Sequence, residues 1–397
     1  MPLRPLLARP GARFACAGDG LCCTDVHALG PLGRDEQKAF RLLLPGALIR
    51  YTDPTFTAIR PSEKRQCPLL APTGCALHAS GGPLAKPNTC RRFPYGLAST
   101  PRGGRVSTNH RCPCRTLGER PPVRLDEAER SLGDRAGRLW ADVVVGPRVA
   151  LTARRRVAFS TYEAVEADLF ARLAASGDPF DALEARPLPP LADTSWDAIG
   201  HALRAEVDGS AAGEAFGWFG DALLQLSGAL RPSRRARPWA PAFDRAERRS
   251  PSPEGPSEVF ADWVADEIWS LRWTLCGPFD VARAELVTRY AVGRRIAQTL
   301  DARGARPDRA AAEAVMVAEL VGSSSLWADV TKSLRAAAAR EARAKKRPAR
   351  APASARPGES GPSRGPLPGR ARAGLRRRGA GRSRAPSRRS GRARRPG

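Results

Sequence analysis

Cysteine is the residue type whose pattern in this sequence points most directly to chemistry. Eight of the nine cysteines lie in the first 114 residues, and the rest of the chain contains only Cys276. Thiolates bind zinc and iron–sulfur clusters, and thiols also form disulfides or act as nucleophiles. The eight clustered residues are therefore the candidate functional residues: Cys16, Cys22, Cys23, Cys67, Cys75, Cys90, Cys112 and Cys114.

The expected cellular location favours one of these chemistries. The apolar run Leu6-Leu7-Ala8 is shorter than the roughly 7–15 apolar residues of a secretory signal. No stretch reaches the roughly 18 apolar residues of a membrane-spanning helix. We therefore expect a cytoplasmic protein with no membrane partner, in which thiols stay reduced. Clustered cysteines in that compartment are more often metal ligands than disulfides or plain buried thiols.

The spacing of the cysteines leaves the metal open. Eight thiols suffice for two four-coordinate zinc sites, or for one iron–sulfur cluster with thiols left over. The sequence has Cys-x5-Cys-Cys and Cys-x-Cys, and it lacks the Cys-x2-Cys pairs of ordinary zinc ribbons. A donor set this rich in sulfur disfavours magnesium and calcium. Asp19 is either an oxygen ligand or a turn residue, and His78 and His110 are either nitrogen ligands or loop histidines.

Four sequence blocks between about residues 12 and 118 carry a family resemblance. They read F-x-C-x5-C-C, then C-P-L-L with G-C-x-x-H, then K-P-x-x-C-R-x-F-P, then C-P-C. In this order they resemble the YkgJ-type cysteine-cluster family, which is described as chelating zinc or iron and includes the flagellin lysine-N-methylase proteins. The first block of that family usually reads C-x-x-C-x-x-C-C, and here Asp19 occupies the second cysteine position.

The resemblance implies that the eight cysteines are ligands of an iron–sulfur cluster or zinc. It further implies, as an alternative function, a methyltransferase-like enzyme that modifies lysine in a protein substrate. In either case Arg91, Arg92, Arg111 and Arg115 either offset the negative charge of the thiolates or are ordinary surface residues.

The segment that carries the cysteines shows little apolar periodicity. Within residues 12–120 we expect a helix at Arg34–Leu44, a strand at Phe56–Arg60, and a hairpin formed by Phe93–Ser99 and Arg105–Asn109. These elements indicate a small, irregular α+β domain with a small core. Metal binding would stabilise such a domain, because the free energy of binding adds to that of folding.

Helical patterns dominate residues 121–340. The clearest helix covers Ser257–Leu275, with an apolar residue at every third or fourth position, and a second begins at Asp280. Further helices are expected at Tyr162–Ala175, Trp196–Val207, Gly213–Leu230, Pro307–Leu320 and Leu326–Ala339. Residues 231–254 are rich in Pro, Arg and Ser and are expected to form a loop or linker. Cys276 follows an apolar helix and is expected to be a buried structural thiol.

The formal net charge is +26, and most of the excess lies in residues 341–397, which are almost entirely Arg, Ala, Pro, Gly and Ser. We expect this tail to be disordered, because it has too little apolar sequence to bury. It is predicted either to have no specific partner, or to make weak non-specific contact with nucleic acid, or to bind an acidic protein. A zinc-stabilised module that contacts nucleic acid is thus a third candidate function.

The sequence therefore predicts an α-rich multidomain protein. A small irregular α+β metal-binding cysteine-cluster domain (12–120) is followed by an all-α helical domain (121–340) and a disordered basic tail (341–397).

Overall fold

The computed structural model of this protein describes residues 2–52, 55–72, 74–134, 136–229, 234–249 and 255–344. Met1–Arg347 form one compact unit, which contains both the cysteine-rich segment and the helical segment. The domain boundary expected near residue 120 stays a prediction. The expected disordered tail lies outside the described residues, except for its first four residues. Among the described helices, none combines the length and the apolar character needed to traverse a bilayer.

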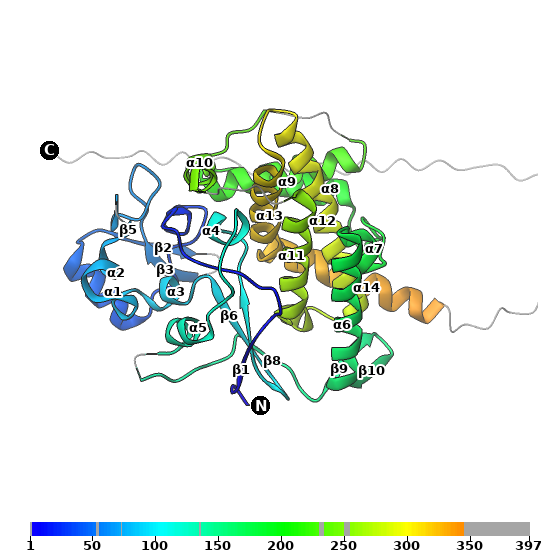
Figure 1. Cartoon of the computed structure of the whole chain (residues 1–397). Coiled ribbons are helices and arrows are strands. Elements are labelled where there is room, and N and C mark those ends of the chain that lie inside the picture. Colours follow the sequence, from blue (N-terminus) through cyan, green and yellow to red (C-terminus); the bar gives the residue numbers. More distant parts are fainter. Residues whose placement is uncertain are drawn as a thin grey trace, which may run out of the picture. The chain divides into compact units, whose positions relative to one another are not determined.

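A four-stranded sheet organises the N-terminal part of this unit (Figure 1). Its strands follow the order β1-β7-β6-β8, in which β6 and β7 are antiparallel and each outer strand is parallel to its neighbour. The hairpin predicted around Arg102-Gly103-Gly104 is confirmed. Glycine is needed there because a Cβ at Gly103 would lie 2.3 Å from the carbonyl oxygen of Pro5, next to β1. The strands are β1 Leu6–Ala8, β6 Tyr95–Thr100, β7 Gly103–Thr108 and β8 Val143–Val144.

Short helices and hairpins surround this sheet. The helix and the strand expected near residues 34 and 56 are confirmed as α1 and β3. The hydrophobic clusters here are small, as expected: one joins Leu97 and Val106 to Leu132 of α5, and another joins Phe40 of α1 to Ile59 of β3. The elements are η1 Leu21–Cys23, α1 Arg34–Leu43, β2 Leu48–Thr52, β3 Thr55–Ile59, β4 Leu70–Ala71, β5 Gly74–Cys75, α2 Ala76–Gly81, η2 Pro83–Ala85, α3 Asn88–Arg92, α4 Pro113–Thr116 and α5 Leu125–Leu132.

The helices of the second half pack around α13, which is buried along most of its length and contacts α9, α11, α12 and α14. All the helices predicted in this half are confirmed, and the apolar stripes of α11 and α12 are buried in the main core. The helices are α6 Phe159–Ser176, α7 Pro179–Leu183, α8 Trp196–Ala205, α9 Ala211–Leu226, α10 Ala240–Arg249, α11 Pro256–Trp269, η3 Arg272–Leu275, α12 Phe279–Asp301, α13 Pro307–Gly322 and α14 Ser325–Ala344.

Two features differ from the sequence-based expectation. The segment predicted to be all-α contains strand β8 and a hairpin formed by β9 Arg148–Thr152 and β10 Arg155–Ala158, so the molecule is mixed α/β. Helix α10 lies where a loop was expected, and its Phe243 is fully buried. Leu21 and Leu117 of the cysteine-rich segment belong to the same core as the helices, so the two segments share packing.

Candidate metal centre

Four of the predicted ligands come together where the loop before η1 meets the start of α4. The Cys114 thiol lies at the centre of this group: it shares hydrogen bonds with the thiols of Cys16 and Cys112. It also accepts a hydrogen bond from the backbone N–H of Ala17, at 3.2 Å. Positive φ angles of 72° at Gly18 and 77° at Gly20 curve the loop. We call this the first thiol group: Cys16, Cys22, Cys112 and Cys114.

The other four predicted ligands form a second thiol group, which includes Cys23 at the end of η1. Cys23 is tied to Cys67 by a backbone hydrogen bond of 2.7 Å from the Cys67 N–H to the Cys23 carbonyl. Burial raises the pKa of Cys90 in α3 to about 12, and negative charge on Cys23, Cys67 and Cys75 would raise it as well, because these thiols are close by. The members of the second thiol group are Cys23, Cys67, Cys75 and Cys90.

The adjacent residues Cys22 and Cys23 join the two groups. Their sulfur atoms lie 4.0 Å apart. Negative charge on Cys16 and Cys114 would raise the pKa of the Cys22 thiol. The hydrogen bond from Cys22 lowers the pKa of the Cys23 thiol, and the positive charge of Lys86 lowers it further. The two thiol groups therefore adjoin at Cys22 and Cys23, and we call the eight cysteines together the cysteine patch.

Burial and mutual repulsion keep most of these thiols protonated in the absence of a cation. Hydrogen bonding to Cys114 and burial raise the pKa of Cys16, and burial raises the pKa of Cys67 to about 11. A bound cation reverses this balance, because it favours the thiolate at every ligand. All nine cysteines are free. Within the described residues no three Cys, His, Asp or Glu side chains already stand in the arrangement of a metal site, so the thiols are gathered but not arranged as ligands.

Asp19 belongs to the first thiol group. Its side chain is fully buried, and its Oδ2 accepts a hydrogen bond of 3.0 Å from the Cys114 thiol. Its Oδ1 lies 3.3 Å from a guanidinium nitrogen of Arg249. The turn that contains Asp19 thus places a carboxylate oxygen among sulfur atoms, at the position where the family pattern has cysteine.

Helix α10 holds this turn in place from the helical half of the chain. Arg245 donates a hydrogen bond of 2.5 Å to the carbonyl oxygen of Asp19, and Arg249 donates to the carbonyl oxygen of Ala17. The prediction of a loop at 240–249 was therefore wrong, and it concealed these contacts. The Arg and Pro content of the segment masked the apolar face formed by Ala242, Phe243 and Ala246.

Two other residues differ from their expected roles. His78 lies exposed on α2, and no contact joins it to either thiol group in the described residues. Cys276 was expected to be a buried structural thiol, but it is exposed, because the apolar helix before it ends at Trp269 and the chain turns outward through η3.

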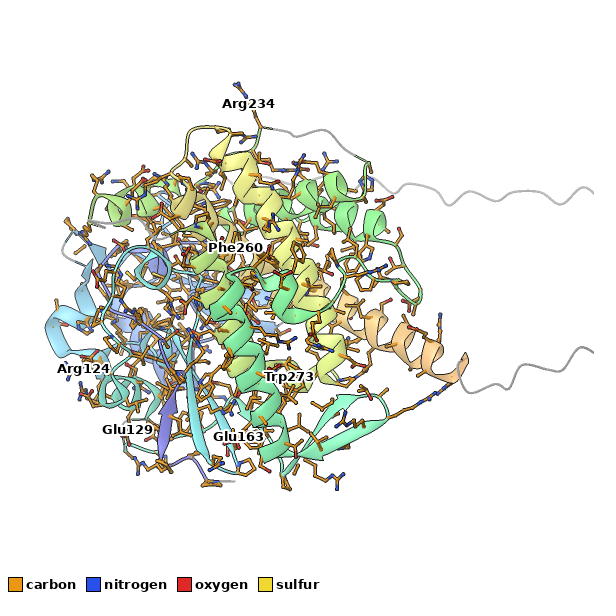
Figure 2. All side chains as sticks on the ribbon, turned by 45° about the vertical axis from the view of Figure 1, so that its right-hand side comes forward. Arg124, Glu129, Glu163, Arg234, Phe260 and Trp273 are labelled. Atoms are coloured by element: carbon orange, nitrogen blue, oxygen red, sulfur yellow. The ribbon has the colours of Figure 1, made fainter. Side chains whose placement is uncertain are left out.

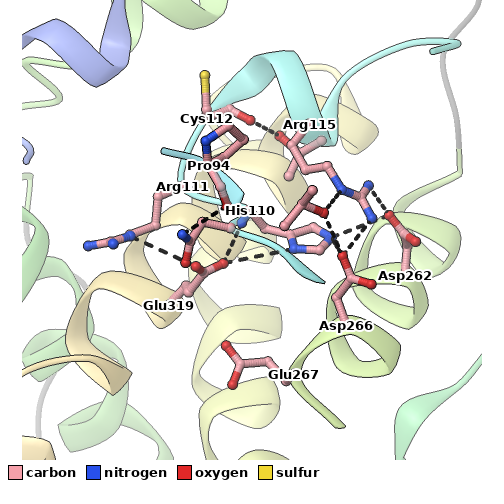
Figure 3. Close-up of polar contacts among 12 residues, drawn as sticks. Pro94, His110, Arg111, Cys112, Arg115, Asp262, Asp266, Glu267 and Glu319 are labelled. Carbon is pink, nitrogen blue, oxygen red and sulfur yellow. Dashed lines mark hydrogen bonds and ion pairs between the residues drawn. The ribbon is translucent and has the colours of Figure 1, made fainter. Parts of the chain in front are cut away.

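Two of the arginines next to the cysteines, Arg92 and Arg115, bind carboxylates, whereas Arg91 donates a hydrogen bond of 2.9 Å to the side-chain oxygen of Asn88. Arg92 binds both oxygens of Asp142, at 2.8 and 2.9 Å. Arg115 binds Asp262 and Asp266 of α11, the latter at 2.9 Å (Figure 3). Arg91, Arg92 and Arg115 are buried, so the interpretation of ordinary surface residues was wrong for these three. The positive charge of Lys86 acts on Cys23, and Arg245 and Arg249 donate hydrogen bonds to the loop that carries Asp19.

A buried ionic cluster fixes the block that carries Cys112 and Cys114 to α11 and α13. Asp266 accepts hydrogen bonds from Arg9 at 2.5 Å, Thr108 at 2.8 Å and Arg115 at 2.9 Å. The backbone N–H of His110 donates to Glu319 of α13 at 2.6 Å (Figure 3). We call this the junction cluster, and its members are Arg9, Thr108, His110, Arg115, Asp262, Asp266 and Glu319.

The charges of the junction cluster balance one another, and all its side chains are buried except that of Asp262, which is partly exposed. Burial opposes ionisation of Asp266, but Arg9, Arg115 and His110 outweigh it and lower the pKa of this carboxyl group below its ordinary value. Arg115, Arg9 and His110 likewise lower the pKa of Asp262. Burial raises the pKa of Glu319. His110, expected to be either a ligand or a loop residue, lies in the loop between β7 and α4, with its Nε2 3.3 Å from Asp262.

Comparison with known proteins gives no relatives. No protein-family model matches this chain, and neither the curated proteins nor the solved structures contain a match.

Proposed function

We propose that this protein is a metal-binding protein that holds an iron–sulfur cluster or zinc through its eight N-terminal cysteines. The observation that supports this most strongly is the convergence of thiols from separate parts of the sequence. Cys16 and Cys114 share a hydrogen bond although almost 100 residues lie between them, and Cys90 senses the charges of Cys23, Cys67 and Cys75. Thiols that serve only as small apolar side chains have no reason to collect in this way.

The chemistry of the donors fits these metals. Soft thiolate ligands favour zinc and iron–sulfur clusters, and four thiols complete a tetrahedral site. Each thiol group contains four cysteines, so the patch has the composition of two such sites. Lys86, Arg245 and Arg249 lie where they would offset the negative charge of thiolates. The resemblance of the four sequence blocks to the YkgJ-type family supports the same proposal.

Purification without oxygen, followed by metal analysis and a visible absorption spectrum, tests the proposal. An iron–sulfur cluster gives iron, inorganic sulfide and a brown colour, whereas zinc gives a colourless protein with bound zinc. Protein that contains less than a tenth of a metal atom per chain after expression with iron and zinc supplied would contradict the proposal.

Single cysteine substitutions test the assignment of ligands. Cys114→Ser and Cys90→Ser each remove one donor from a different group, so each should lower the metal content. Cys276→Ser is the matched control, because it removes an exposed thiol that lies outside the patch. Equal metal content in all three variants would show that the eight thiols are not the ligands.

A further inference from the structure

A cavity of about 450 Å³ opens on a part of the molecule that none of the eight N-terminal cysteines lines. The β9–β10 hairpin forms one wall, the segment 273–278 forms the second, and Arg335 of α14 borders the third side. The volume lies within the range of about 300–1,000 Å³ that is usual for sites of small molecules. The lining residues are Val144, Val145, Gly146, Arg148, Val149, Ala150, Thr152, Ala153, Arg156, Trp273, Thr274, Leu275, Gly277, Pro278 and Arg335.

Three arginines supply all the charge of this lining. Arg148 and Arg156 lie on neighbouring strands, and each donates a hydrogen bond to the other's backbone carbonyl, at 3.0 and 3.1 Å. The stem of Arg335 lies over Gly277, where a Cβ would be 3.5 Å from the Arg335 Cδ. Across the described ranges of the chain, none of the three has a carboxylate at ion-pair distance, whereas just over half of the other described arginines do. The cavity therefore concentrates uncompensated positive charge.

The rest of the lining is largely apolar and includes a fixed aromatic ring. Trp273, labelled in Figure 2, packs its ring against Tyr162 and Phe279, with ring centres 5.5 and 5.0 Å apart, and donates its indole N–H to the Ile268 carbonyl. Leu275 and Val144 are each 66% exposed, which is unusual for large apolar side chains. The apolar surface and the arginines therefore face the same space.

We infer that this cavity binds a small organic phosphate, in which a phosphate group is attached to a flat apolar body such as a nucleobase. Guanidinium groups bind phosphate oxygens through paired, charge-assisted hydrogen bonds. Three guanidinium groups match the two negative charges of a phosphate monoester better than they match the single charge of a carboxylate. The body of the ligand would cover Trp273 and Leu275. This inference does not depend on the metal proposed for the thiol groups.

Calorimetric titration of the full-length protein with adenosine monophosphate at low salt tests the inference. Saturable binding is expected, and adenosine or inorganic phosphate alone should bind at least about tenfold more weakly, because each lacks half of the contacts. Arg148→Ala and Arg335→Ala should each weaken binding of adenosine monophosphate by about tenfold or more, since each removes a charge-assisted hydrogen bond.

Two further variants distinguish binding inside the cavity from non-specific attraction to positive charge on the surface. Gly146→Leu should abolish binding: Gly146 lines the cavity, a Cβ there meets no atom within 4 Å, and the backbone does not require glycine. Arg155→Ala is the matched control, because Arg155 lies on the same hairpin with its side chain exposed but does not line the cavity. It should change affinity by less than about twofold, as expected for a screened surface charge. Thermal unfolding of each variant verifies that it is folded.

Three outcomes would overturn the inference. The first is the absence of saturable binding of adenosine monophosphate in the folded wild-type protein. The second is inorganic phosphate that binds as tightly as adenosine monophosphate, which would exclude a role for the apolar wall. The third is an equal loss of affinity in Arg155→Ala and Arg148→Ala together with tighter binding of a single-stranded oligonucleotide, which would indicate a nucleic-acid surface.

Discussion

At the scale of single residues, Asp19 is the most informative position. A carboxylate fully buried among thiols normally costs folding free energy, but here the Cys114 thiol and Arg249 both contact it. Oxygen is a harder donor than sulfur, so a metal held with Asp19 would experience a mixed ligand set. Asp19 is thus the residue that distinguishes this chain from the cysteine pattern it resembles.

The variant Asp19→Cys should increase the resistance of bound zinc to removal by a chelator, because it replaces oxygen by a softer donor. Asp19→Ala should decrease that resistance. Chelator competition followed with a zinc-sensitive dye measures both. Identical release rates in the wild type and both variants would show that Asp19 does not reach the metal.

His27 makes stability depend on pH. Burial, together with the positive charge of Arg111, lowers the pKa of its imidazole to about 3, so His27 is neutral in the folded protein. The unfolded chain binds a proton at an ordinary pKa of about 6.5, so stability is complete above that pH and falls as the pH decreases towards 3. From pH 7 to pH 5 this residue should lower the free energy of unfolding by about 2 kcal/mol.

Urea denaturation at the two pH values checks this prediction. His27→Asn, which cannot titrate, should remove most of that difference. His201→Asn, a change at an exposed histidine of α8, should leave it intact. An unchanged pH dependence in His27→Asn would contradict the prediction.

At the scale of elements, α10 connects the two halves of the molecule. Its apolar face lies in the main core, and Arg245 and Arg249 bind carbonyl oxygens of the first cysteine loop. Because α10 contacts α4 as well as α13, it lies between the block that carries Cys112 and Cys114 and the central helix. The first thiol group therefore depends on a helix more than 200 residues away in sequence.

Arg245→Ala should make the first thiol group more accessible to solvent. The Asp19 carbonyl would lose a charge-assisted hydrogen bond, which should lower the free energy of unfolding by about 1.5–3 kcal/mol and speed the reaction of the N-terminal thiols with an alkylating reagent. Arg248→Ala, at an exposed position of the same helix, is the control and should match the wild type. Equal alkylation rates in both variants would show that α10 does not hold the loop.

At the scale of the whole molecule, the junction cluster determines how the cysteine-rich segment is fixed to the helices. Arg9 and Arg115 approach Asp266 from two distant parts of the sequence, with all three side chains buried. Trp269 adds a hydrogen bond of 2.9 Å to the carbonyl of Val106 in β7. Loss of one partner from such a cluster leaves buried charge without compensation, which costs far more than loss of a surface ion pair.

Asp266→Ala should therefore lower the free energy of unfolding by about 3–5 kcal/mol. Asp126→Ala, which breaks exposed pairs with Arg124 and Arg130, should leave it nearly unchanged. Chemical denaturation measures both. A small effect of Asp266→Ala would show that the junction cluster does not stabilise the contact between the two halves.

The sequence predicted the parts of this molecule that depend on local pattern. The stripe at Phe260, Trp263 and Val264 predicted α11, and Pro45-Gly46 correctly predicted the end of α1. Helix α10 was missed because arginine and proline outnumber the apolar residues over the whole of residues 231–254, which contain it. The division of the cysteines into two groups could not be predicted, since it depends on which loops meet in space. The junction cluster is equally non-local, because Asp262 and Asp266 resemble ordinary polar residues of an amphipathic helix.

The two sides of the contact between α10 and the loop around Asp19 are synthesised at different times. Arg245 follows Asp19 by 226 residues, and at about 5–20 residues per second a ribosome needs roughly 10–45 seconds to synthesise that interval. During this period the nascent chain already contains Cys16, Cys22 and Cys23, while α10, whose arginines bind the loop that connects Cys16 to Cys22, has not yet been made. These three thiols are therefore most accessible to metal ions and oxidants in solution before translation is complete.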